Sequence, residues 1–558
     1  MITKEESEAK SLRLDKAIKA AHNRETVEIV RITGFNAFFK GIHNSKNIKK
    51  LILEHNENMS KIQHLRSYFI WLYFYDIIQD NKPFPDLSSE KIGNFFRNCY
   101  TVGIGNEIKD KSIQSCYDKY LEYFKTDCKL PENLGNIVTH AANTYIACFI
   151  RHFCNIDNVL NRIKRYIKLR IYGYLRQTKD DDIDDFEDKY IALEDYGDNP
   201  INNILNALQD SAYNTKAMHL KQVELLNEIK EEFGMKPNVN MTNHWLRKNI
   251  EKSIVFTLKT VKNIDELKEL TKDLEYDKIR KGALQQKKFV PLNNLQRSFI
   301  TIDTTDLAKI LKLECDKSLY EEAVRGTFYK NINEIFRSKK YSNKPSTITE
   351  NTYYFTGTID TDGVSVHAHF RKKKTYIEPI QKDKEKLNTI PKVLLLVDPG
   401  RVNIVTITVM VNGEVQFKNK KPLKYTLSAK HYHNIIGSHR QHKIRTKTKT
   451  ENYTILTGCK AEILNYLNVN KNQKWKTVLS KTSANNKRRV NIARDKALLK
   501  WFFNVKRSVK ALTGEKTATV VWGVKVAPTG IGNIPAPTCR VYDVAKRIEK
   551  NVQRLLKT

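Results

Sequence analysis

Closely spaced cysteine pairs are missing from this sequence of 558 residues. The chain contains eight cysteines, and no two of them form a Cys-x-x-Cys motif. Disulfide frameworks and zinc ribbons are built on cysteines at short, regular spacings. We therefore expect free thiols in a reducing compartment, and no zinc ion in this chain.

Long apolar segments are missing as well. No apolar run approaches the roughly 20 residues that a membrane-spanning helix needs. The first ten residues, MITKEESEAK, contain no apolar core of a secretory signal. A peripheral membrane protein is also disfavoured, because no basic amphipathic anchor or acylation motif begins the chain. We expect no signal peptide and no association with a membrane.

Acidic residues are scarce in the last third of the chain. Residues 392–558 contain 34 Lys and Arg residues but only eight Asp and Glu residues, a balance of +26. The rest of the chain contributes only +9 to the formal net charge of +35. Such a concentration of positive charge predicts a phosphate-rich partner, DNA or RNA. A structural protein that binds no nucleic acid is hard to reconcile with this balance.

One stretch of this basic region combines two apolar runs with a carboxylate. The run VLLLV at 393–397 is followed by Asp398, a Pro-Gly pair and the β-branched run 404–411. This pattern predicts a buried strand, a tight turn and a second strand that pairs with the first. Asp398 then lies where a core strand reaches the surface, a position that suits a ligand of Mg²⁺. Ordinary Asp-Pro-Gly turn chemistry explains the same residues equally well.

The first 330 residues are predicted to be mostly helical. The aromatic-rich segment 64–75 is too apolar for a surface helix, so we expect it to cross a core rather than to stack on nucleic-acid bases. A long helical segment at 146–174 carries five basic residues in its second half. These form either a face for a nucleic-acid backbone or an ordinary solvated face. The acidic run 180–188 is interpreted as a solvated loop.

A β-hairpin is predicted next, with strands at 353–359 and 364–370 joined by the turn Asp-Thr-Asp-Gly. Two histidines of the second strand, His367 and His369, share one face as a metal pair would. Because no third ligand is in view, we interpret them as exposed polar residues of the strand.

The last third contains four further predicted elements. A strand is expected at 414–417, and a polar, basic, histidine-bearing segment at 425–450. Residues 488–512 carry one apolar stripe (Leu498 to Leu512), basic residues on much of the remaining surface, and Gly514 at the C-cap, which is typical of a helix. The buried strand predicted at 517–522 follows this long helix. It should therefore run parallel to the strand that ends at Asp398.

Five segments then occur in the order of one known family. They are TDGVSV at 361–366, VDPGRVN at 397–403, a Ser-and-Tyr segment at 425–432, VVWG at 520–523 and GIGNIPAP at 530–537. On these segments the chain resembles the Fanzor proteins, the eukaryotic and viral relatives of the transposon-encoded TnpB nucleases. The resemblance covers residues 345–558, and no specific motif precedes residue 340.

The resemblance implies an RNA-guided DNA endonuclease whose partners are a guide RNA and target DNA. It implies an α+β multidomain fold: a helical recognition region (1–340), a small β-rich, wedge-like segment with a linker (341–391) and a partial RuvC-like, RNase H-like α/β domain (392–558). A nuclear location follows from the eukaryotic relatives and the basic clusters, and a viral gene fits the family as well. No protein partner is evident.

In RuvC-type centres, three carboxylates hold two Mg²⁺ ions that promote attack by water. The first carboxylate maps onto Asp398, the candidate catalytic and metal-binding residue, with Mg²⁺ as the implied cofactor if the centre is completed. The candidate nucleic-acid-binding residues are basic: Arg371, Lys372, Lys373, Lys374, Arg401, Arg440, Lys443, Arg445, Lys487, Arg488, Arg489 and Arg494.

The sequence departs from the family after the strand at 517–522. Related TnpB proteins have a catalytic Glu at the end of this strand, where this chain has Gly523 and Val524. In Fanzor relatives the second carboxylate, a zinc ribbon and the third carboxylate follow the helix expected here at 540–556, and this sequence ends at Thr558. We therefore expect the chain to lack efficient nuclease activity.

Seven other carboxylates follow residue 391, and none has a strand-end position as clear as that of Asp398: Glu414, Glu451, Glu462, Asp495, Glu515, Asp543 and Glu549. A lone carboxylate binds Mg²⁺ weakly. Three interpretations stay open, so the sequence does not decide whether the chain is an enzyme. In the first, the chain is a decayed nuclease that still binds nucleic acid. In the second, it is an active nuclease whose gene model ends early, and in the third a co-opted nucleic-acid-binding protein without catalysis.

Overall fold

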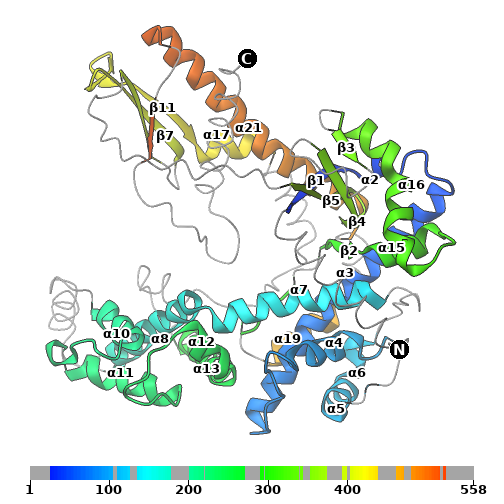
Figure 1. The fold of residues 1–558 in the computed structure, drawn as a ribbon. Helices are drawn as coiled ribbons and strands as arrows, with labels where there is room; N and C mark the ends of the chain where they lie inside the picture. Colours follow the sequence, from blue (N-terminus) through cyan, green and yellow to red (C-terminus); the bar gives the residue numbers. More distant parts are fainter. Residues whose placement is uncertain are drawn as a thin grey trace, which may run out of the picture. The chain divides into compact units, whose positions relative to one another are not determined.

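The computed structural model of the protein describes residues 26–104, 108, 110–125, 135–177, 200–218, 220–270, 289–293, 296–337, 340–342, 352–373, 392–398, 403–437, 460–470, 479–515 and 519–522. These residues form helices and sheets of the α+β class, as expected (Figure 1). None of the described helices has the length and apolar character that a membrane span requires.

The described residues divide into two compact units. The large unit contains residues 28–372 together with 460–470 and 479–480. The small unit contains residues 392–398, 403–437, 481–515 and 519–522, and the division also assigns residues 26, 27 and 373 to it. The residues of the predicted hairpin lie in the large unit together with the helices, and so does the later segment 460–470.

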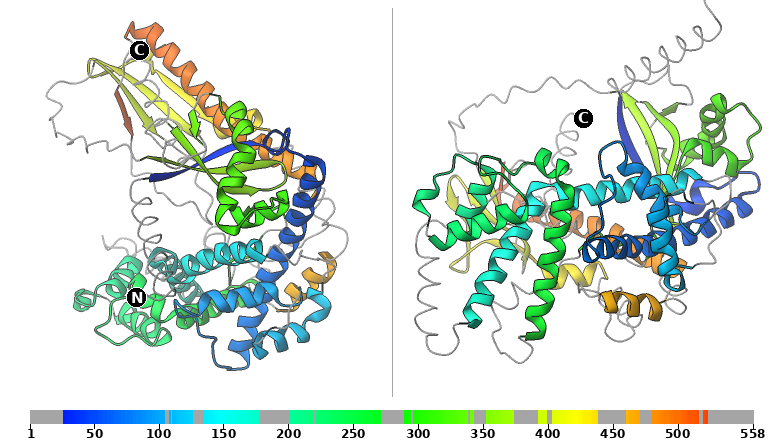
Figure 2. Two further views of the ribbon diagram at one scale, coloured as in Figure 1. Left: turned by 45° about the vertical axis from the view of Figure 1, so that its right-hand side comes forward. Right: turned by 90° about the horizontal axis from the view of Figure 1, so that it is seen from below.

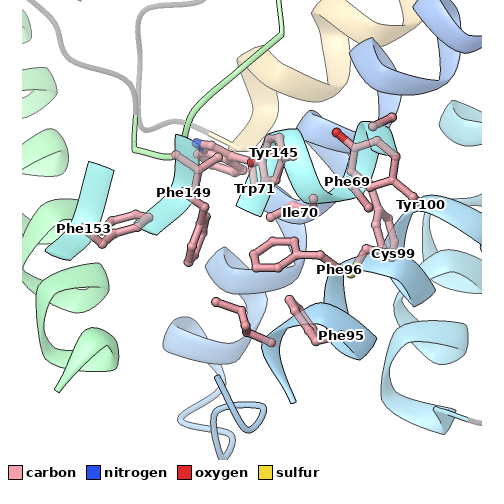
Figure 3. Packing of buried hydrophobic residues seen from close by; sticks show 14 of the residues in the cluster. Phe69, Ile70, Trp71, Phe95, Phe96, Cys99, Tyr100, Tyr145, Phe149 and Phe153 are labelled. Carbon is pink, nitrogen blue, oxygen red and sulfur yellow. The ribbon is translucent and has the colours of Figure 1, made fainter. Parts of the chain in front are cut away.

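The core of the large unit is built around helix α3 (Ser45–Gln79). Figure 3 shows Phe69, Ile70 and Trp71 of α3 packed against side chains of α4 (Ile92–Thr101) and α7 (Gly135–Cys154). Trp71 is only 1% exposed. The prediction that segment 64–75 crosses a core is therefore confirmed, and its buried rings are not accessible for stacking on bases.

The helix predicted at 146–174 is broken. Helix α7 ends at Cys154 and α8 (Ile156–Gln177) begins two residues later. Asn155 lies between them, and its side-chain oxygen accepts a hydrogen bond from the backbone N–H of Asn158 at 3.1 Å, an N-cap interaction. The other helices of this part are α5 (Lys111–Lys119), α6 (Leu121–Phe124), α10 (Pro200–Gln209), α11 (Leu220–Glu232), α12 (Asn243–Lys248), α13 (Ile250–Leu270) and the 3₁₀ turn η1 (Thr215–Ala217).

A five-stranded sheet completes the large unit, in the order β1-β5-β4-β2 with β3 beside β4. Strands β4 (Thr352–Thr361) and β5 (Ser365–Lys373) are the predicted hairpin. Asp362 fixes its turn by accepting hydrogen bonds from two backbone N–H groups at 3.0 and 2.8 Å. The other elements here are β1 (Thr26–Gly34), β2 (Ile300–Ile302), β3 (Lys340–Ser342), α2 (Phe35–Phe38), α15 (Thr304–Leu311), η2 (Lys317–Leu319) and α16 (Tyr320–Ile335).

Two strands of this sheet, β1 and β2, come from the region that the sequence predicted to be mostly helical. β2 is only three residues long, so its alternation is too short to be recognised. Helix α19 (Lys460–Asn470) also packs in this unit, where the ring of Tyr466 lies 5.3 Å from that of Tyr68 on α3.

The small unit is a second sheet, in the order β11-β7-β6-β12 with β8 beside β7. β6 (Val393–Asp398) pairs antiparallel with β7 (Asn403–Val411) and parallel with β12 (Thr519–Trp522). The predicted strand–turn–strand unit and the predicted parallel neighbour are both confirmed. The three leucines of the run are half-buried, and Val393 and Val397 are its buried residues.

The third long strand of this sheet was not predicted correctly. The strand expected at 414–417 consists of two short pieces, β8 (Glu414–Val415) and β9 (Phe417–Lys418), and β9 pairs with β10 (Lys421–Pro422). The longer strand is β11 (Lys424–Ser428), at the start of the segment interpreted as polar. Its signal is short: Tyr425 and Leu427 alternate with polar residues over only five positions.

Helix α21 (Lys481–Thr513) covers one face of this sheet, together with α17 (Ala429–Ile435) (Figure 2). It buries Leu498, Val505 and Val509 against the strands, as the apolar stripe predicted. Leu512, the last residue of the predicted stripe, is 52% exposed because the helix ends one residue later. Gly514 is the C-cap, with φ +67° and its N–H bonded to the carbonyl of Lys510 at 2.9 Å.

Candidate metal and nucleic-acid site

Asp398 is the last residue of the central strand β6 and is exposed. Val397, directly before it, is buried and lies between Ile407 of β7 and Trp522 of β12. The carboxylate is therefore carried by a strand that is paired on both sides. The prediction that Asp398 lies where a core strand reaches the surface is confirmed.

Three other strands have an end on the same edge of this sheet. β12 runs parallel to β6, so Trp522 ends beside Val397. β11 ends at Ser428, which lies opposite the first residue of β7, Asn403. The Ser428 hydroxyl caps α17 by accepting a hydrogen bond from the backbone N–H of His431 at 3.2 Å. Asp398 is the only carboxylate that the described residues place at this edge.

Two other carboxylates of the small unit lie at the opposite edge, and Asp495 belongs to helix α21. Glu414 begins β8 and pairs with Val411, at the far end of β7. Glu515 accepts a hydrogen bond of 2.5 Å from the ammonium of Lys392, directly before β6. Glu462 is carried by α19 of the large unit, while Glu451, Asp543 and Glu549 lie outside the described residues.

These positions decide how well the site fits a magnesium ion. Within the described part of the chain, no group of three or more His, Cys, Asp or Glu side chains has the geometry to hold a metal. A single carboxylate would leave Mg²⁺ with most of its water ligands, so it does not make a two-metal centre. Asp398 fits the role of one ligand, and we derive no catalytic step from it.

The candidate basic residues fall into different parts of the molecule. Arg488, Arg489 and Arg494 lie on α21 of the small unit, where Arg489 is exposed and the other two are half-buried. Lys487 belongs to the same helix. Arg371, Lys372 and Lys373 end β5, and the large unit extends to Lys372. The remaining candidates lie outside the described residues: Lys374, Arg401, Arg440, Lys443 and Arg445.

Two of the five basic residues at 162–170 are buried and therefore not available to a nucleic-acid backbone. Arg162 and Arg165 are 4% and 9% exposed. Arg162 donates to the hydroxyl of Thr257 at 2.8 Å, and its guanidinium lies over the ring of Phe153. Burial lowers the pKa of Arg162 to about 9. These arginines belong to the core of the helical bundle.

The two histidines of β5 are half-buried, not exposed as expected. Nδ1 of His369 lies 2.7 Å from a carboxylate oxygen of Glu28, and Nε2 lies 2.9 Å from one of Asp360. The hydrogen bond with Asp360 raises the pKa of His369. The ring of His367 packs against that of Phe299. Because both nitrogens of His369 face carboxylates, they have the geometry of an ion-paired imidazolium rather than of a metal ligand.

A cavity in the large unit, lined by residues of α3, α4 and α5, also carries charged groups. Most of their charges are paired within the unit: Lys119 lies 2.6 Å from Asp76, and Lys91 lies 3.0 Å from Asp86. The hydroxyl of Tyr120 and the ammonium of Lys460 also bond to Asp76, at 2.7 and 2.8 Å. We interpret this cluster as a structural connection between α19 and the helical bundle.

Comparisons of the chain with models of protein families and with curated proteins give no match.

Proposed function

We propose that the protein binds nucleic acid as an RNA-guided DNA-binding protein related to the Fanzor family. The observation that carries this proposal is the small-unit sheet. In chain order its four main strands are arranged third, second, first, fourth, and the fourth is parallel to the first. This is the strand order of an RNase H-like core, and Asp398 ends the first strand. A shared strand order is weak support by itself. The family motifs and the positive charge of the same region strengthen it.

In this proposal the guide RNA selects the target by base pairing, and the protein holds the paired strands through phosphates and shape. The small unit supports this role through exposed cations on α21, among them Arg489. The large unit serves as the recognition region, and its hairpin as the wedge-like element. The proposed location is the nucleus, where such DNA targets lie.

We further propose that binding, rather than efficient cleavage, is the activity of the 558-residue chain. Bound Mg²⁺ would activate water and stabilise the leaving oxygen in a complete centre. Asp398 would be one of its ligands, and further carboxylates would have to join it. An active endonuclease is the second candidate function, and the exposed strand-end position of Asp398 favours it.

The test uses the purified full chain, an RNA transcribed beside its own gene, and DNA that matches this RNA. We expect the complex to bind at low salt and to weaken steeply as salt rises, because phosphate contacts release counterions. No binding at 50 mM salt would contradict the proposal.

A second assay separates binding from cleavage. The complex is incubated with Mg²⁺ and matched DNA, with Asp398→Ala as the site variant. Glu414→Gln serves as the control, since this carboxylate lies at the other edge of the same sheet. Cleavage that Asp398→Ala abolishes and Glu414→Gln preserves would establish the second candidate, the active enzyme.

A further inference from the structure

The outer face of α21 carries a continuous row of exposed side chains. Successive members are three or four residues apart, so they lie on one side of the helix. All of them are exposed, and the row extends over about 32 Å at 1.5 Å per residue. We call this set the outer row: Arg489, Ile492, Lys496, Lys500, Phe503, Arg507 and Lys510.

The apolar face of the same helix is already used. Leu498, Val505 and Val509 pack against the small-unit sheet, on the other side of the helix from the outer row. The outer row therefore does not contribute to the core of the unit. The residue types of the outer row are therefore explained by contacts at the surface and not by packing in the core.

The five cations of the outer row have no acidic counterpart in the described residues. None of the ion pairs found there includes any of these five side chains. Like charges three or four residues apart destabilise a helix. A row of this kind is costly unless a polyanion lies along it, and phosphates spaced along a nucleic-acid strand meet that requirement.

One aromatic ring stands within this row of cations. Phe503 is 53% exposed and has Lys500 one turn before it and Arg507 one turn after it. Its neighbours Trp501 and Phe502 pack against the core instead. A ring between phosphate-binding side chains is the arrangement with which proteins stack on the bases of a single strand.

We propose that the outer row of α21 binds a single-stranded segment of nucleic acid, with its cations on phosphates and Phe503 stacked on a base. This inference rests on the proposed nucleic-acid binding and assigns it a site. A duplex is disfavoured because its base faces are already stacked. A membrane surface is disfavoured because the row has only two apolar residues, far fewer than an interfacial helix needs.

The first experiment measures how binding of a fluorescent dT20 oligonucleotide depends on salt. The row variant carries K496Q, K500Q, R507Q and K510Q. The matched control carries K46Q, K50Q, K236Q and K248Q, four exposed lysines of the large unit. Each phosphate contact on a single strand contributes about 0.7 to the slope of log K against log salt. We expect the slope to fall by about 3 in the row variant and to stay unchanged in the control.

The second experiment tests stacking with Phe503→Ala, and Ile492→Ala as the control from the same row. Loss of one stacked base weakens binding about 5- to 150-fold. We expect this loss for Phe503→Ala with dT20 but not with an abasic oligonucleotide of the same length. We expect little change for Ile492→Ala with either ligand.

Several results would overturn the inference. Equal losses on dT20 and on the abasic strand, equal losses on a duplex, or a loss seen only with phosphatidylserine vesicles would each remove the base-stacking site. If the wild-type chain binds dT20 and both row variants bind it equally well, the outer row is not the site, although the proposed function stands. If the wild-type chain binds no nucleic acid, both proposals fail.

Discussion

The two units differ in how they use part of their basic residues. In the large unit several arginines are buried: Arg66 donates to the carbonyl of Val102, and Arg325 is paired with Glu321 at 2.8 Å and lies over the ring of Tyr354. In the small unit the basic residues of the outer row are exposed. A count of Lys and Arg therefore does not locate a nucleic-acid surface. Burial and internal partners decide which cations are available to phosphate.

Aromatic residues follow the same division. In the large unit the rings of α3, α4 and α7 pack against one another, with Phe96 and Phe149 only 4.8 Å apart. The small unit has a mainly aliphatic core made by the sheet, α17 and α21, with Tyr432 as its one buried ring among the described residues, and it leaves Phe503 outside. The same residue type is thus a core component in one unit and a candidate contact with a base in the other.

The largest expected effect is the loss of stability caused by Trp71→Ala, which tests the difference between buried and exposed aromatic rings. Trp71 is nearly fully buried and stacks on Tyr75 at 4.9 Å, so its truncation leaves a cavity. We expect a loss of about 3–5 kcal/mol in the stability of the large unit. Phe503→Ala should cost less than about 0.5 kcal/mol, because the ring is exposed. Urea unfolding followed by hydrogen exchange of each unit measures both. Equal losses would show that Phe503 is also a core residue.

The sequence predicted the central elements of the small unit well, and the physical reason is local. The run before Asp398 is apolar, the run after it is β-branched, and a long helix before 519–522 requires a crossover and hence a parallel strand. The failures are short or distant elements. β2 has three residues and β11 has five, and β1 joins a sheet whose hairpin lies more than 300 residues later. Neither short alternation nor distant pairing leaves a clear pattern in the sequence.

Site prediction was limited for a different reason. The strand-end position of Asp398 follows from the pattern alone. The division of the basic residues into buried and exposed ones does not follow from the pattern, because Arg162 and Arg489 occur in helical segments of similar composition. Only the packing of each helix decides which of these side chains are buried. Helical spacing could have identified the outer row, since its members recur every three or four residues. The exposure of Phe503 depends on which face the sheet covers.

Two carboxylates provide the next test of the comparison. Asp76 of the large unit accepts hydrogen bonds from Lys119, Tyr120 and Lys460, whereas Asp398 of the small unit is exposed. We expect Asp76→Asn to reduce stability by about 1.5–3 kcal/mol, because three partners lose a charged acceptor. Asp398→Asn should change stability by less than about 0.5 kcal/mol. Thermal unfolding of the two matched variants measures the difference. A large loss for Asp398→Asn would mean that this carboxylate has a structural role.

The smallest expected effect is a pH dependence confined to the large unit. His369 lies between Glu28 of β1 and Asp360 of β4, with its ring nitrogens 2.7 and 2.9 Å from the two carboxylates. Only the protonated ring of His369, the imidazolium, donates a hydrogen bond to both carboxylates. Asp360 also accepts from Thr301, and the half-buried His367 lies on the same strand as His369.

The hydrogen bond with Asp360 raises the pKa of His369 in the folded protein. The stability that protonated His369 contributes to the fold is therefore fully present below the ordinary pKa of histidine, about 6.5. It is lost as the pH rises through the higher pKa of His369 in the folded protein. Because Glu28 is exposed, we expect a loss of only about 1 kcal/mol. The protection of β1 amides from hydrogen exchange, corrected for the intrinsic rise of the exchange rate with pH, should fall over this pH range, and His369→Gln should abolish the fall. The same fall in protection in the Gln variant would assign the pH dependence to another group.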